Sequence, residues 1–227
     1  MTDSRASILA NIRRSLATAR LPAPPNVTPS STNANVAPNE LAERFAAELA
    51  ALSGAFQRVA RADLTNFIVQ VLREREAGEL LTWRADQLPA PEVLIGLRTA
   101  GVGVCEADLP RDESRAAGVA DLARLTVGLT GADAAFADTG TLALLSGAGR
   151  PRLASMSVRT HIALLAPEQL YPSLGAWLAE RQQLRDELRT RAALTFITGP
   201  SRTADIEMTL TVGVHGPAEV LVVLVGN

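Results

Sequence analysis

The residues best suited to chemistry follow a short apolar run in the last quarter of the chain. Residues 194–197 (Leu-Thr-Phe-Ile) predict a buried strand, and the ten residues after it carry hydroxyls, a guanidinium and two carboxylates. In parallel sheets, ligands bind beyond the carboxyl ends of the strands. We therefore expect a ligand site there, formed by the polar members Ser201, Arg202, Thr203, Asp205 and Glu207.

Each part of this segment suggests a role in binding an anion. Gly199 and the proline after it end the strand and force a turn. Ser201 or Thr203 can cap a short following helix, which leaves free backbone N–H groups that favour an anion. Arg202 offers a planar fork that suits a carboxylate or a phosphate. The alternative is that Arg202 pairs with one of the two nearby carboxylates inside the fold and that nothing binds.

A glycine-rich loop at residues 146–152 (Ser-Gly-Ala-Gly-Arg-Pro-Arg) is the second candidate. The backbone around Gly147 and Gly149 could surround a phosphate, with Arg150 or Arg152 as counter-charge. The loop has no P-loop lysine and does not match the dinucleotide fingerprint. A plain turn without a ligand is the alternative.

Two further candidates are a bend and a histidine. Residues 138–141 (Asp-Thr-Gly-Thr) place a carboxylate at a tight bend, where Asp138 could transfer a proton or act as a nucleophile. The alternative is a hairpin turn in which Asp138 bonds its own backbone. His215 could act as a general base or bind an anion, or could be structural. His161 begins an apolar strand, which favours a structural role.

Composition excludes several mechanisms. All 22 basic residues are arginine, so no lysine can serve as a Schiff-base nucleophile or a phosphate-loop cation. The single cysteine, Cys105, excludes a disulfide framework and an iron–sulfur cluster held by this chain alone. No metal-ligand spacing is visible around the two histidines. The net charge of −2 gives no electrostatic reason to expect nucleic acid or an anionic membrane.

The first 38 residues differ from the rest. Residues 3–19 predict an amphipathic helix with Ile8, Ile12 and Leu16 on one side, and residues 21–38 are rich in proline. We predict a helix and extended arm over 1–38 and a domain over 39–227. The helix is either a mobile appendage or a docking element for a partner. With no apolar signal core and no membrane-length run, a cytoplasmic protein is expected.

Apolar patterning from residue 40 onward indicates strands that alternate with helices. This order favours an α/β fold with a mainly parallel, Rossmann-like sheet, helices on both faces and an inserted antiparallel hairpin around 138–140. Helices are expected near 41–52, 64–77, 91–97, 108–124 and 168–189. Strands are expected at 56–60, 79–83, 103–106, 126–130, 134–137, 141–145, 161–165, 194–197 and 220–225.

Five segments together resemble the lactate-utilisation (LUD-domain) family, in particular its protein C branch. They are residues 129–133, 137–141, 146–152, 197–207 and 213–217. The resemblance is close over about 125–227 and looser from about residue 40. The family usually has glutamate where this chain has Asp138, which keeps the charge but withdraws it by one methylene.

The resemblance implies a fold similar to ribose-phosphate isomerases and CoA-transferases. It also implies a role in oxidising L-lactate to pyruvate beside two partner proteins, one of which binds iron–sulfur centres. Since this chain lacks the cysteines for such centres, it would act as a subunit that binds no cofactor alone. It would bind an organic anion, a nucleotide or a partner surface through Arg150, Arg202 and the glycine-rich backbone.

Two other hypotheses stay open. The chain could be a stand-alone isomerase or an acyl- or CoA-transferase-like enzyme acting on a phosphorylated or thioester substrate, with Asp138 or Glu207 as base or nucleophile. It could also be a scaffold whose N-terminal helix recruits the iron–sulfur proteins. The anion-binding hypothesis requires guanidinium groups and free amide donors to converge at the carboxyl edge of the sheet.

Overall fold

The computed structural model describes residues 4–19, 36–106, 112–113, 115–181, 183–204, 210–213 and 215–226. The chain divides into two compact units, residues 1–30 and 31–227. The first contains the amphipathic helix α1 (Ser4–Thr18), which buries none of its residues. No helix within the described ranges combines the length and the apolar character needed to cross a bilayer.

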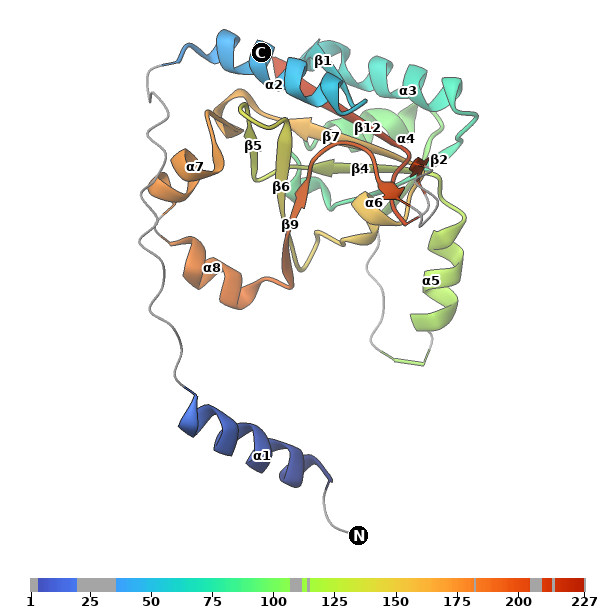
Figure 1. Ribbon diagram of the computed structural model, residues 1–227. Coiled ribbons are helices and arrows are strands. Elements are labelled where there is room, and N and C mark those ends of the chain that lie inside the picture. The colour runs from blue at the N-terminus through green and yellow to red at the C-terminus, as the bar shows by residue number, and fades with distance from the viewer. Residues whose placement is uncertain are drawn as a thin grey trace. The chain divides into compact units, whose positions relative to one another are not determined.

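A six-stranded parallel sheet forms the centre of the second unit (Figure 1). Its strands lie in the order β1-β12-β7-β4-β2-β3, and every neighbouring pair is parallel. The inner strands β4, β7 and β12 are almost entirely buried, which explains their continuous apolar runs. The strands are β1 (Ala55–Ala60), β2 (Glu79–Thr82), β3 (Gly103–Glu106), β4 (Val127–Gly131), β7 (Thr160–Leu165) and β12 (Glu219–Gly226).

Helices cover both faces of this sheet. On one face α3 (Leu64–Glu74) packs against α4 (Val93–Thr99). On the other, α2 (Pro38–Ala51) packs Phe45 against Phe56 of β1, with ring centroids 5.8 Å apart, and α6 (Leu153–Met156) lies on β4 and β7. A side chain at Gly128 would place its Cβ 1.9 Å from the carbonyl oxygen of Ala154, so glycine allows α6 to approach the strand.

A second, four-stranded sheet covers the same face as α2 and α6. Its order is β8-β5-β6-β9, and β5 (Ala134–Phe136) and β6 (Thr141–Ser146) form the expected antiparallel hairpin. Alternate residues of this hairpin face two cores. Ala135 and Leu142 join the core of the large sheet, whereas Phe136 and Leu145 pack with Trp177. The α/β class with a mainly parallel sheet and an inserted hairpin is therefore confirmed.

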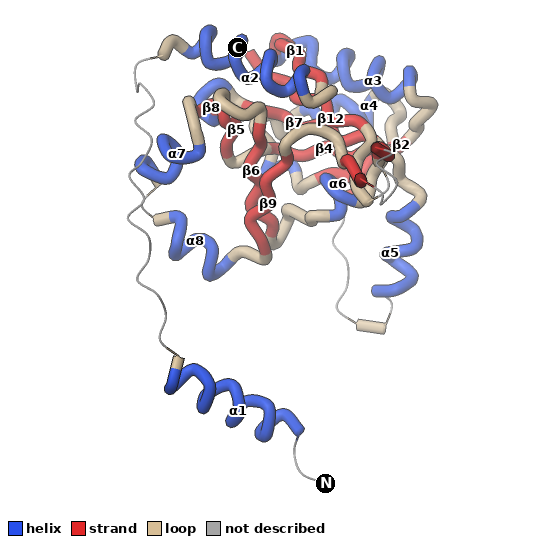
Figure 2. The backbone as a smooth tube through the Cα atoms, viewed as in Figure 1, coloured by secondary structure: helices blue, strands red, loops and turns tan. Residues whose placement is uncertain are grey.

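The prediction of one long helix over 168–189 was wrong. The segment holds a short helix η3 (Pro167–Gln169), the strand β8 (Leu170–Tyr171), and the separate helices α7 (Leu174–Glu180) and α8 (Leu184–Thr190), as Figure 2 shows. Pro172 follows β8, and the Ser173 hydroxyl accepts a hydrogen bond from the Ala176 N–H to begin α7. Leu174 and Leu188, which we expected on the buried side, are each 38% exposed.

Residues 194–197 form a strand as predicted, but the prediction that this strand is buried and part of the parallel sheet was wrong. The strand exists as β9 (Ala193–Ile197), but it is the edge of the four-stranded sheet and Phe196 is 46% exposed. Two short strands, β10 (Arg202–Ala204) and β11 (Leu210–Val212), follow as an antiparallel pair that the sequence did not reveal. The remaining elements are α5 (Arg115–Ala123), η1 (Arg61–Asp63) and η2 (Ala85–Gln87).

His161 is fully buried in β7, as its apolar setting suggested. Its Nε2 lies 2.8 Å from the Thr130 hydroxyl, while its Nδ1 has no hydrogen-bond partner within the described part of the chain. Burial lowers the pKa of His161 to about 4 because the charged imidazolium would lose its hydration.

We expect acid to destabilise the protein through His161. Above pH 6.5 the imidazole is neutral whether the chain is folded or unfolded, so it adds no pH dependence. Between pH 6.5 and 4 the unfolded chain binds a proton that the folded chain does not, so stability falls by up to roughly 3 kcal/mol. Urea unfolding of wild type and His161→Leu at pH 7 and 4.5 measures this. An equal loss in both proteins on acidification would contradict it.

Candidate functional site

The strongest candidate site lies beyond the carboxyl ends of β2 and β4. These strands are neighbours, but the connection after β2 leads to β3 on one side and the connection after β4 leads to β7 on the other. Doubly wound sheets bind ligands at such topological switch points. Side chains from three segments meet there, namely 83–87, 131–133 and 147–152.

Four residues, Trp83, Gln87, Asp133 and Arg150, form what we call the switch-point cluster. Arg150 Nη1 donates to Asp133 Oδ1 at 2.7 Å, and Arg150 Nε donates to Gln87 Oε1 at 2.7 Å. The guanidinium also lies over the Trp83 ring, 5.1 Å from its centroid. The side chains of Arg150 and Asp133 are 17% and 6% exposed, so this ion pair is largely withdrawn from water.

Asp133 links the cluster to the second sheet. Its other oxygen, Oδ2, accepts from the Leu145 N–H at 2.6 Å, and its own N–H donates to the Ala143 carbonyl at 2.8 Å. The carboxylate therefore has one partner on β6 and one on the loop that follows β6. The sequence reasoning missed Asp133 as a site residue, although it lies within one of the resembling segments.

The glycine-rich loop is a tight turn beside this cluster. The backbones of Gly147 and Arg150 form hydrogen bonds with each other. Gly149 has a φ of 71°, which residues other than glycine rarely adopt. The turn fits between two arginines. A Cβ at Gly149 would lie 2.8 Å from Cδ of Arg84, and one at Gly147 would lie 3.3 Å from Cδ of Arg191.

Positive charge exceeds negative charge around this turn. Arg84 pairs with Asp86 at 3.1 Å, and Arg150 pairs with Asp133. Arg152 is exposed and Arg191 half-buried, and neither forms an ion pair within the described residues. The guanidinium of Arg191, which lies against Gly147, and that of Arg152, two residues beyond the turn, therefore have charges that are not compensated by an ion pair among the described residues.

The structure separates this turn from the segment 198–202. Strands β6 and β9 are antiparallel, with Leu142 opposite Ile197 and Ser146 opposite Ala193. The loop after β6 and the segment after β9 therefore leave from opposite ends of the ladder, about 14 Å apart at 3.4 Å per residue. The expectation that all the predicted residues converge at the carboxyl edge was wrong, because it took β9 for a strand of the parallel sheet.

Arg202 lies at the amino-terminal edge of the parallel sheet. Its Nη2 donates to the Leu52 carbonyl at 2.6 Å and to the Ser53 hydroxyl at 3.2 Å, just after α2 ends and before β1 begins. A cation at the carboxyl end of a helix satisfies free carbonyls and the helix dipole. Arg202 thus satisfies backbone and side-chain acceptors at the end of α2. Asp205, Glu207 and the side chain of Thr203 lie outside the described residues, so its predicted pairing with one of the two carboxylates stays a prediction.

Gly199, Ser201 and the loop of His215 lie near Arg202, whereas Asp138 lies in the bend between β5 and β6. Gly199 packs on Leu52, where an added Cβ would lie 2.9 Å from the leucine Cβ. The Ser201 N–H donates to the Pro217 carbonyl at 2.8 Å, so the exposed His215 lies in the adjoining loop. Asp138 is half-buried, accepts from the Thr139 hydroxyl at 3.3 Å, and donates its N–H to the Pro172 carbonyl at 3.2 Å.

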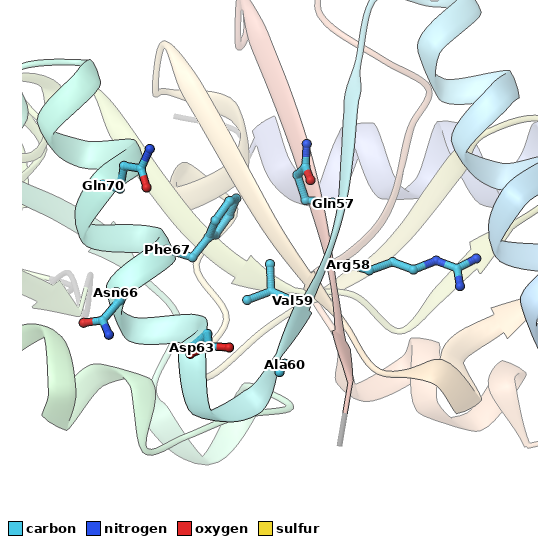
Figure 3. A pocket seen from close by; sticks show the side chains of 8 residues that line it. All are labelled: Gln57, Arg58, Val59, Ala60, Asp63, Asn66, Phe67 and Gln70. Carbon is cyan, nitrogen blue, oxygen red and sulfur yellow. The ribbon is translucent and has the colours of Figure 1, made fainter.

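Two cavities that the sequence did not indicate flank the carboxyl end of β1. One, of about 370 Å³, lies between β1 and α3 and is lined by Gln57, Val59, Asn66, Phe67 and Gln70 among others (Figure 3). The second, of about 350 Å³, lies on the α2 side beside Asn39, Leu170 and Leu224. Neither cavity contains a predicted site residue. Within the described ranges, His, Cys, Asp and Glu side chains form no cluster that could hold a metal ion.

Comparison with known proteins identifies relatives. The family model for the LUD domain matches residues 42–225. A lactate utilization protein C from Exiguobacterium sp. is 43% identical over 103 residues, 45% of each chain, and one from Anoxybacillus flavithermus is 27% identical over 82% of this chain and 81% of that protein. In the relative from Exiguobacterium sp. and in two others of the same name, the matched segment spans about half of the relative's own length.

Two further comparisons extend over most of the chain. A lactate utilization protein C from Halalkalibacterium halodurans is 32% identical over 179 residues, covering 71% of this chain and 69% of that one. A crystal structure of a DUF162 family protein from Deinococcus radiodurans has the same fold, with a TM-score of 0.61 at 23% identity over 85% of this chain and 100% of that one. With the family model matching most of its length, the chain belongs to the LUD domain family.

Proposed function

We propose that this chain is a subunit without redox centres of its own that is required for the oxidation of L-lactate to pyruvate, together with iron–sulfur partner proteins. In this role it binds a small organic anion beside the switch-point cluster. Membership of the LUD domain family and the name shared by its relatives, lactate utilization protein C, support a role in lactate utilisation. With one cysteine, the chain needs partners to carry the electrons.

The ligand part of the proposal depends on one observation, the excess of arginine around the Gly147–Arg150 turn. Arg150 is fixed by Asp133 and Gln87, so it orders the turn. Arg152 and Arg191 then remain to meet a carboxylate, for which a guanidinium is the best-matched partner. L-Lactate and pyruvate are both carboxylates, and each is small enough for two arginines to enclose one end.

We expect the variant Arg152→Ala/Arg191→Ala to bind L-lactate and pyruvate at least roughly tenfold more weakly than wild type, because each charge-assisted hydrogen bond contributes about 1.5–3 kcal/mol. Isothermal titration calorimetry of the purified chain measures this. Arg73→Ala, which removes an exposed arginine from α3, is the matched control. Unchanged binding in the double variant, or no binding in wild type, would contradict the proposed site.

The physiological role is tested separately. Replacing the gene by one that encodes the double variant should abolish growth of the host on L-lactate but not on pyruvate, while circular dichroism shows an unchanged fold. Co-purification from lactate-grown cells should recover proteins with iron–sulfur absorbance. Turnover of a sugar phosphate or a thioester by the purified chain alone would instead support the isomerase or transferase alternative, with Asp138 or Glu207 as its catalytic carboxylate.

A further inference from the structure

The outer edge of β1 is an open strand edge. β1 is the last strand of the large sheet, and its only partner within the described residues is β12. Along an edge strand, alternate residues direct their N–H and C=O groups away from the sheet, where another strand can bind them. Ala55, Gln57, Arg58 and Ala60 are exposed along this edge.

Natural proteins often protect such edges with a β-bulge or a proline, and β1 has neither. Its six residues pair with β12 in unbroken register, from Ala55 opposite Leu221 to Ala60 opposite Gly226, so there is no bulge. The strand contains no proline. Its one charged side chain, Arg58, lies on the α2 face, where Nη1 and Nη2 donate to the side-chain and backbone oxygens of Asn39 at 3.1 and 3.2 Å.

The two cavities described above both lie against this strand and share Arg58, Val59 and Ala60. One lies on the α3 face of β1, and the other lies on the α2 face, as the positions of Gln57 and Arg58 in Figure 3 illustrate. A strand added to β1 would direct alternate side chains to the two faces. The edge therefore offers main-chain bonding groups together with space on both sides.

We propose that the occupant of this edge is β1 of a second copy of the chain, paired antiparallel about a two-fold axis to form a continuous twelve-stranded sheet. The side-chain pattern of β1 supports this choice. The two-fold axis is perpendicular to the sheet, so each residue and its copy point to the same face. Directly opposite residues in an antiparallel pair also point to the same face, so one residue must lie opposite its own copy, with the axis between them. The registers that pair most of the strand have the axis at Gln57 or at Arg58.

Charge selects between the two registers. An axis at Arg58 would set two guanidinium groups opposite each other, which is unfavourable. An axis at Gln57 sets that amide opposite its own copy and Phe56 opposite Arg58 of the second copy, which pairs a cation with an aromatic ring. This register places no like charges opposite each other within β1. The interface is isologous and closes as a dimer.

The test uses charge changes at Gln57, an exposed residue on the axis. We expect the full-length wild-type chain to form dimers in sedimentation equilibrium. Gln57→Lys and Gln57→Glu should each raise the dimer dissociation constant at least roughly tenfold, because each sets like charges opposite each other. An equimolar mixture of the two variants should recover dimers, because lysine then faces glutamate.

Matched controls place the same charges elsewhere. Thr99→Lys and Thr99→Glu change an exposed residue of α4, which packs against β3 at the far edge of the sheet, and they should leave self-association unchanged. Hydrogen exchange of residues 55–60 should slow as wild type is concentrated into dimers. The proposal would be overturned if the wild type were monomeric, or if the charge changes at Gln57 left the dimer dissociation constant unchanged. It would also be overturned if the two variants failed to form dimers together, or if a different extended polypeptide were found on β1 of a monomer.

Discussion

Replacing Asp133 by alanine is expected to lower the free energy of unfolding by about 3–5 kcal/mol, the usual cost of removing one partner of a buried ion pair. The change would leave the Arg150 guanidinium largely buried without its counter-charge and would leave the Leu145 N–H without an acceptor. Urea unfolding followed by circular dichroism measures the loss.

Two comparisons separate the causes. Asp133→Asn keeps an oxygen that can accept from the Leu145 N–H, so its free energy of unfolding should fall less than that of Asp133→Ala. The difference between the two variants reports the hydrogen bond rather than the charge. Asp86→Ala breaks the exposed pair with Arg84 and should move the unfolding midpoint little. If Asp133→Ala were no more destabilising than Asp86→Ala, the ion pair would not hold the turn in place.

The second large effect is expected at Gly140, in the bend that follows Asp138. Gly140 has a φ of 62°, and a Cβ there would lie 2.6 Å from the Leu49 nitrogen and 2.9 Å from the Glu48 carbonyl carbon. Both neighbours are backbone atoms of α2 and cannot turn away. Gly140→Ala should therefore lower the free energy of unfolding by roughly 3 kcal/mol or more, because the left-handed backbone and the overlap with α2 both add to the cost.

Gly101 is the matched control for the backbone part of this cost. It has a φ of 82°, but a Cβ there would meet nothing within 4 Å. Gly101→Ala should therefore show only the conformational penalty, about 1–2 kcal/mol. Thermal unfolding of both variants measures the difference. Equal losses at the two positions would mean that the bend does not depend on close contact with α2.

Local patterns predicted most of the fold. Apolar patterning located every strand of the large sheet to within one residue at each end. The pattern was clearest for β4, β7 and β12, because a strand buried on both faces needs continuous apolar residues. Patterning failed at 168–189, where leucines at helical spacing continue across Pro172 and Ser173. There a proline and a capping serine divided the segment, and a two-residue strand paired with β5.

The candidate site was predicted only in part. Gly147, Gly149, Arg150 and Arg152 do lie at the carboxyl edge of the large sheet, beside β2 and β4. Their partners Trp83 and Gln87 come from a segment about 65 residues away, and no local pattern in the sequence connects the two. The open edge of β1 was equally invisible, since an inner strand and an edge strand can have the same residues.

From the amino-acid sequence alone follow the strands of the large sheet, the absence of lysine and multi-cysteine chemistry from this chain, and its membership of the family. The short strands β8, β10 and β11 do not follow from it. The positions of the polar loops depend on how the strands pair in three dimensions. The antiparallel pairing of β6 with β9 sends Arg150 and Arg202 to opposite ends of one ladder, and Arg202 then binds the carbonyl of Leu52, 150 residues earlier. Every residue carries the same carbonyl, so the fold alone determines which one a guanidinium reaches.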